Sequence, residues 1–169
     1  MQREQVSIPK NLLYILLAVV YFALQSSWGR YFSVRGFHID LLPCFVAAAA
    51  LLDGPVEGVI MGVAVGVLYD VGFVGIDGVY PIFFLLFGFI AGSLSRLTLS
   101  RNYVSMMMLS AGEMILIGLL RYFCYLLPMH GASFGLVMQQ VFGGAVLTAA
   151  LSFLVYAPVK KISKKFESR

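Results

Sequence analysis

The sequence predicts an all-α integral membrane protein that folds as one compact bundle of six transmembrane helices. Hydrophobic residues make up 60% of the 169 residues and charged residues only 12%, whereas average soluble domains carry about 25% charged residues. The mean hydropathy of +0.91 is far above that of soluble proteins. Long uncharged segments also alternate with short charged ones, a pattern typical of chains that cross a bilayer repeatedly.

Four of the predicted helices are long enough to cross a hydrocarbon core, which takes about 20 helical residues. They are residues 11–29, 78–95, 102–127 and 135–157. Pro158 closes the last of them. We therefore expect a transmembrane domain over 11–158, between a cytoplasmic N-terminus at 1–10 and a basic cytoplasmic tail at 159–169.

The segment between the first and fourth helices allows two interpretations. Its uncharged runs, 41–52 and 58–69, cover only about 18 Å each as helices, and the turn "DGPVE" separates them. They form either two short spans, over 38–53 and 56–71, or a re-entrant pair. A re-entrant pair would place both acidic residues of the turn deep in the membrane at a cost of several kcal/mol, so six spans are favoured.

The distribution of basic residues predicts the sidedness of the bundle. With six spans and the N-terminus inside, only Arg30 and Arg35 lie on the outer side. The basic residues on the inner side are Arg3, Lys10, Arg96, Arg101, Lys160, Lys161, Lys164, Lys165 and Arg169. This positive-inside bias predicts a multi-pass protein with both termini in the cytoplasm. The lysines near the C-terminus fit either a partner site or an anchor to anionic membrane lipid, and the lipid anchor is the expected role. The net charge is read as topology, and no contact with nucleic acid is expected.

Glycine recurs at every fourth residue in the third helix, at Gly58, Gly62 and Gly66, and the fourth helix carries Gly88 and Gly92. Small residues at this spacing form a smooth stripe, which permits the close approach of a second helix within a bilayer. We therefore expect these glycines to mediate packing inside the bundle or contact with a partner helix. The third helix is expected to be the packed centre of the bundle.

The residues that follow this stripe resemble a known family. An apolar helix that reads G-x3-G-x3-D, at Gly62, Gly66 and Asp70, is followed by a glycine-rich turn with Gly78 and by another apolar helix. The preceding helix starts with an acid and a proline, which also fits. This pattern is similar to that of the rod shape-determining protein MreD family. The specific part of the resemblance covers about residues 38–95.

The resemblance implies a fold, a location and a function. MreD proteins are non-catalytic components of the bacterial cytoplasmic (inner) membrane and belong to the machinery that elongates the side wall of rod-shaped cells. The implied direct partner is an MreC-like single-span protein. The same complex contains MreB, the RodA glycosyltransferase and its transpeptidase partner. The implied fold is similar to the substrate-binding subunits of energy-coupling-factor vitamin transporters.

The residues themselves also favour a protein without enzymatic activity. The sequence has no metalloprotease motif, phosphate-binding loop or nucleophile motif, and His38 and His130 are isolated. We expect no catalytic residue, no cofactor and no metal ion. Cys44 and Cys124 lie in apolar runs, which favours free thiols.

The main alternative function is a membrane subunit that binds the substrate of a vitamin or small-solute transporter. Such subunits often carry an alanine-x3-alanine stripe on their first helix, and "NLLYILLAVVYFALQSS" has none. A small intramembrane enzyme is a third possibility, which the lack of a reactive motif disfavours.

Four ionisable residues in the predicted spans are candidates for polar contacts or a functional site. They are Asp40, Asp70, Glu113 and Arg121. Glu113 lies about 17 Å along its helix, near the bilayer midplane, where ionisable side chains face the bundle interior and usually have partners. Arg121 is too far along the same helix for a direct pair with Glu113, but Asp70 or Asp40 of a neighbouring helix is within its expected reach. For these four residues the sequence leaves two roles open. They make structural contacts, or they line a cavity or bind a partner.

Overall fold

A computed structural model describes residues 8–28, 33–34, 37–38, 40–72, 78–126 and 134–167, and this part of the chain is almost entirely helical. The elements in chain order are α1 (Ile8–Trp28), β1 (Ser33–Val34), β2 (Phe37–His38), α2 (Pro43–Asp53), α3 (Pro55–Gly72), α4 (Val79–Leu97), α5 (Tyr103–Arg121), the π-helix η1 (Tyr122–Leu126), α7 (Phe134–Leu151) and α8 (Phe153–Glu167). The two short strands pair antiparallel.

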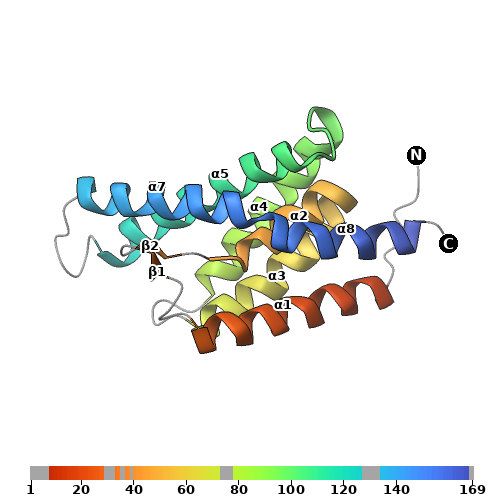
Figure 1. The fold of residues 1–169 in the computed structure, drawn as a ribbon, viewed down its shortest axis with the longest axis horizontal. Coiled ribbons are helices and arrows are strands. Elements are labelled where there is room, and N and C mark those ends of the chain that lie inside the picture. Colours follow the sequence, from red (N-terminus) through yellow and green to blue (C-terminus); the bar gives the residue numbers. More distant parts are fainter. Residues whose placement is uncertain are drawn as a thin grey trace.

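The helices form an elongated bundle in which α7 and α8 follow one another along the length of the molecule (Figure 1). α5 runs beside α7, and α1 runs beside α8 in the opposite direction. The hydroxyl of Tyr21 on α1 donates to the carbonyl of Leu154 on α8 at 2.9 Å, which fixes this alignment. α2 lies among these helices, and α4 packs on α2 and α3 with its far side exposed.

Within the described residues, four helices are long and apolar enough to cross a membrane, so the chain is a membrane protein by this measure. The qualifying segments are Pro9–Ser26, Val79–Leu97, Tyr103–Cys124 and Phe134–Leu151. Six spans are not confirmed, because neither α2 nor α3 is among these segments, and α2 has only 11 residues, or about 16 Å of helix. It begins at Pro43 rather than near residue 38, since a proline without an N–H suits the first turn of a helix.

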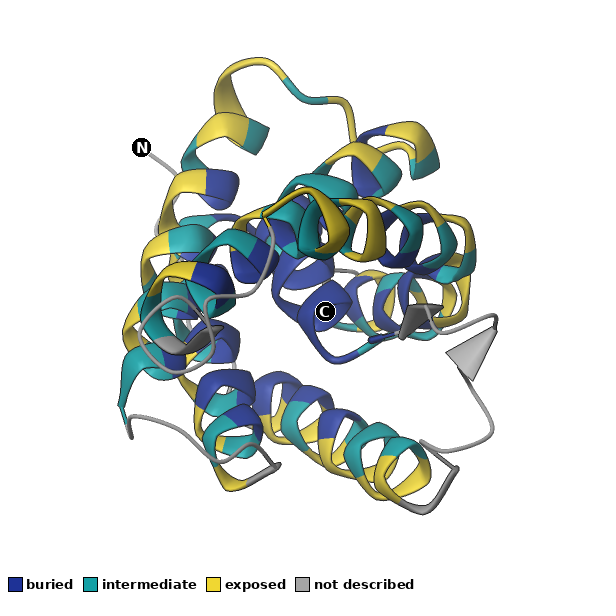
Figure 2. Cartoon of the chain, turned by 90° about the vertical axis from the view of Figure 1, so that its left-hand side faces the viewer, coloured by how far each residue is buried: buried dark blue, intermediate teal, exposed yellow. Residues whose placement is uncertain are grey.

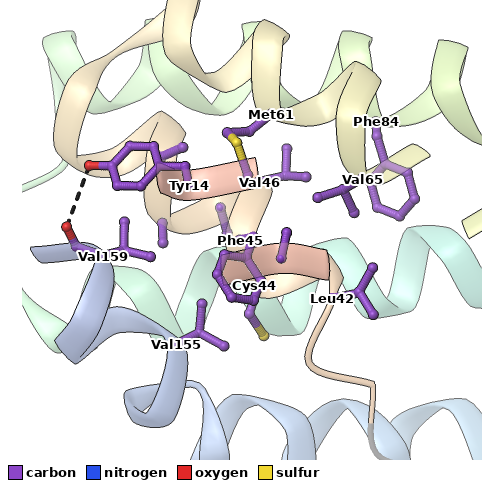
Figure 3. Packing of buried hydrophobic residues seen from close by; sticks show 14 of the residues in the cluster. Tyr14, Leu42, Cys44, Phe45, Val46, Met61, Val65, Phe84, Val155 and Val159 are labelled. Atoms are coloured by element: carbon purple, nitrogen blue, oxygen red, sulfur yellow. Dashed lines mark hydrogen bonds between the residues drawn. The ribbon is translucent and has the colours of Figure 1, made fainter. Parts of the chain in front are cut away.

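The centre of the bundle is α2, which corrects the expectation that the third helix would occupy it. All residues of α2 from Pro43 to Leu52 are buried, whereas α3 exposes Val63, Val67 and Val71. Figure 2 shows buried positions gathered inside the bundle and exposed ones on the outer faces. Figure 3 shows Phe45 and Val46 of α2 among side chains from the surrounding helices. A helix that is apolar on every side must be enclosed by protein or by lipid.

α3 and α4 pack antiparallel through the five predicted glycines. A side-chain carbon added at any of the five would lie less than 3.0 Å from the backbone of the facing helix or the turn before it. Gly58 faces Gly88, Gly62 faces Phe84, Gly66 faces Pro81, and Gly92 faces Pro55. The glycines therefore lie in an internal interface, and Gly88 and Gly92 do not form an outer surface for a partner helix.

The C-terminal part of the chain also differs from the prediction. The sixth predicted helix, 135–157, is interrupted at Ser152, whose buried hydroxyl donates to the carbonyl of Ala149 at 2.7 Å. The segment assigned to a tail is helical as far as Glu167, and its residues Val159 and Ser163 are buried. α8 is thus part of the packed structure. Residues 1–7, 168 and 169 of the predicted cytoplasmic termini lie outside the described residues.

Candidate functional site

A buried polar cluster lies where the chain enters α2. The Gln25 side-chain amide donates to Asp40 Oδ1 at 2.7 Å, and the Tyr69 hydroxyl donates to Asp40 Oδ2. The Asp40 backbone N–H donates to Thr148 Oγ1 at 3.2 Å. We call Gln25, Asp40, Tyr69 and Thr148 the Asp40 cluster. It joins α1, α3 and α7 to the start of α2.

The local sequence explains why Asp40 occupies this place. Asp40 lies three residues before Pro43, where the backbone is not yet helical and its N–H needs an outside partner. Gln25 supplies a second bond here, because its carbonyl oxygen accepts from the Leu41 N–H at 3.3 Å. Asp40 is only 6% exposed, so the bonds to its carboxylate replace the water that the bundle excludes.

Glu113 on α5 is fully buried, as its position near the midplane predicts. Neither of its carboxyl oxygens has a hydrogen-bond partner among the described residues. Asp40 and Cys44 lie near Glu113. The expectation that Glu113 faces the interior is met, whereas the structure supplies no hydrogen bond for it from the described residues.

Asp70 and Arg121 lie at the neighbouring ends of α3 and α5. Asp70 Oδ2 accepts a hydrogen bond of 2.6 Å from the N–H of Gly78, at the N-terminus of α4. Gly78 has φ of +88°, a conformation that costs glycine little and other residues more. Arg121 lies within electrostatic range of Tyr69. The structure therefore ties Asp70 to the turn before α4 and brings Arg121 to the edge of the Asp40 cluster.

A second polar cluster, which the sequence did not predict, lies at the opposite end of α2. Lys10 Nζ is 3.3 Å from Asp53 Oδ1 and 3.0 Å from Glu57 Oε1. Asp53 also accepts 2.7 Å hydrogen bonds from the hydroxyls of Tyr14 and Ser163. We call these five residues the Lys10 clamp. It ties the start of α1 and the end of α8 to the turn between α2 and α3.

A signal for this clamp was present in the charge pattern, because the predicted topology places Lys10 and the "DGPVE" turn on the same side. The charge pattern did not predict that α8 packs against the bundle and brings Ser163 to the turn. The clamp places Asp53 and Glu57 at the end of the bundle with Lys10.

Both clusters are suited to holding helices together. Asp40 and Asp53 act as acceptors for side chains of other helices, which fixes the relative positions of those helices. Among the described residues, no group of three or more histidine, cysteine or acidic side chains is placed to hold a metal ion. The thiols of Cys44 and Cys124 are not joined by a disulfide.

Comparison with known proteins found no relative of this chain. No protein-family model, no curated protein and no solved structure matches the chain.

Proposed function

We propose that this protein is a non-catalytic scaffold of the bacterial cell-elongation complex, of the MreD type. It would reside in the cytoplasmic membrane with both termini inside and hold an MreC-like single-span protein. MreB, RodA and its transpeptidase partner would belong to the same assembly. The proposed role is to position these proteins for synthesis of the lateral wall.

The observation that carries this proposal is that the residues of the MreD resemblance form one structural unit. Gly62 and Gly66 pack directly against α4, and the carboxylate four residues later bonds to Gly78 at 2.6 Å, so helix, turn and helix are fixed together. Each residue of the pattern thus has a physical task in the α3–α4 hairpin. Both polar clusters likewise join helices, which is consistent with a scaffold.

The outer face of α7 is our candidate for the partner's span, because the glycine stripes are used internally. Leu136, Phe142 and Val146 are 71%, 53% and 67% exposed on this helix, and the exposed Gln139 lies among them. A glutamine amide in lipid gains from a hydrogen bond to a neighbouring helix. A single span that packs on this face would both cover the apolar side chains and satisfy the amide.

Site-specific photo-crosslinking in the bacterium that encodes the protein tests this proposal. A photoreactive residue at position 139 should crosslink to an MreC-like protein, whereas one at Leu86, exposed on α4, is the matched control.

Depletion of the protein should turn rod-shaped cells into spheres, because misplaced synthases would no longer build a cylinder. Normal rods after complete loss, in a genome without a second copy, would refute the proposal.

A second candidate function is the solute-binding subunit of a transporter, and Glu113 is the observation in its favour. A fully buried carboxyl group without a hydrogen-bond partner among the described residues has unused capacity to bind a polar solute. Growth and uptake measurements separate the two functions. Loss of uptake of one nutrient with normal cell shape would select the transporter.

A further inference from the structure

α8 presents its lysines from a fixed helix. Val155, Tyr156, Val159 and Ser163 are buried against the bundle. The Val159 carbonyl accepts a hydrogen bond of 3.4 Å from Tyr14 on α1, as Figure 3 shows. The opposite side of the helix is exposed and carries Lys161, Lys164 and Lys165. These charges therefore have defined positions relative to the rest of the molecule.

Every exposed charged side chain that the structure describes is basic. These residues are Arg96, Arg101, Lys161, Lys164 and Lys165, which we call the basic surface. They gather at one end of the bundle, because Tyr156 on α8 donates a hydrogen bond of 2.9 Å to the carbonyl of Arg101. Asp53 and Glu57, two acidic residues described at this end, are engaged in the Lys10 clamp with side chains 9% and 7% exposed.

Exposed apolar side chains adjoin the basic surface on α4 and precede it by about two turns on α8. On α8, Phe153 and Leu154 are exposed two turns before Lys161, a separation of about 12 Å along the helix axis. On α4, Leu94 and Leu97 flank Arg96, and Leu97 is 83% exposed. Basic residues at the end of an apolar belt lie at the depth of lipid headgroups when that belt is in the hydrocarbon core. This position favours lipid over a soluble acidic protein as the occupant.

We propose that the basic surface binds the headgroups of anionic phospholipids. Two features distinguish it from a mobile basic tail. Its lysines project from a docked helix, and arginines from the α4–α5 end contribute to the same face. Binding would hold α8 at the membrane boundary. The proposal does not depend on the function proposed above, since it rests only on charge and packing.

Native mass spectrometry of the purified full-length protein tests this assignment. The protein is delipidated in mild detergent and offered phosphatidylglycerol and phosphatidylcholine with identical acyl chains. The wild type should retain the anionic lipid in preference, and added salt should weaken that preference. The variant K161Q/K164Q should lose about fivefold in relative retention for each lysine replaced. The matched control K161R/K164R keeps the charge and should keep the preference.

Thermal unfolding of each variant shows whether the fold is intact, and both lysines are exposed, so no loss is expected. Equal retention of the two lipids by the wild type would overturn the proposal. So would an unchanged preference in a folded K161Q/K164Q variant, or displacement of the lipid by inorganic phosphate at the same concentration. Lysine-dependent binding of an acidic protein without any lipid preference would reassign the surface to that protein.

Discussion

At the scale of single residues, two buried carboxyl groups in the same region differ sharply in their partners. Asp40 accepts from Gln25 and Tyr69, and its backbone N–H is bonded to Thr148. Glu113 is completely buried and has no such bond among the described residues. Burial without a hydrogen bond costs a polar group part of its solvation free energy, and the cost is larger for a charged one. Asp40 therefore contributes to the fold, whereas Glu113 opposes it unless a group outside the described structure binds it.

We expect Glu113→Gln to leave the free energy of unfolding unchanged or to raise it. Glutamine has nearly the same shape and carries no charge, so its burial costs less than that of a carboxylate. Thermal unfolding of the purified protein in one detergent measures the effect, with Asp40→Asn as the destabilised comparison. A marked loss of stability in Glu113→Gln would show that the carboxyl group has a partner. A stable variant that fails to support rod shape would instead assign Glu113 to function.

At the scale of helices, the sequence could predict local patterns better than the packing that several helices create together. The glycine spacing predicted a close helix contact, and α3 and α4 make that contact through Gly58, Gly62 and Gly66. The central place of α2 was missed, although its run of apolar and alanine residues on every side is typical of an enclosed helix. Because its apolar run is short, the sequence instead predicted either a short span or one half of a re-entrant pair.

In the candidate site too, the features that depend on one helix could be predicted, whereas those that depend on packing among several helices could not. The interior location of Glu113 could be predicted, because an ionisable residue in the middle of an apolar helix avoids lipid. The partners of Asp40 could not, because Gln25, Tyr69 and Thr148 come from three other parts of the chain. Ser163 joined the Lys10 clamp only because α8 is docked, and a run with several lysines had predicted a tail.

We expect Gly62→Ala to destabilise the protein and Gly112→Ala to stabilise it. An added carbon at Gly62 would lie less than 3.0 Å from the backbone at Phe84, so α3 and α4 must separate at a cost of about 1–3 kcal/mol. The same carbon at Gly112 on α5 meets nothing within 4 Å and should gain up to about 1 kcal/mol from helix propensity. Unfolding temperatures of the two variants give the comparison. Equal effects at both positions would contradict the proposed interface.

At the scale of the whole molecule, the two ends of α2 are held by different polar clusters. The Asp40 cluster fixes the start of α2 to α1, α3 and α7. The Lys10 clamp fixes its end to α1 and α8. Since α1 contributes to both clusters, this helix and α8 together close the bundle over the central helix.

The sidedness of the bundle gives a direct test of the positive-inside prediction. Ser100 lies exposed between α4 and α5, next to the basic surface, and is expected to face the cytoplasm. In a Ser100→Cys variant without Cys44 and Cys124, an impermeant thiol reagent should react only after the cells are opened. Reaction in intact cells would place the basic surface outside and contradict the proposed orientation.

The Lys10 clamp gives the strongest prediction for the stability of the whole molecule. Lys10→Met would leave the carboxylates of Asp53 and Glu57 buried without their cation, which typically costs about 3–5 kcal/mol. Neutralising both acids as well, in K10M/D53N/E57Q, should recover most of that loss, because no uncompensated charge remains. Unfolding temperatures of the wild type and the two variants separate this effect from lost packing of the lysine stem. A triple variant no more stable than Lys10→Met would mean that the geometry of the clamp, and not its charge balance, holds α1 and α8 over α2.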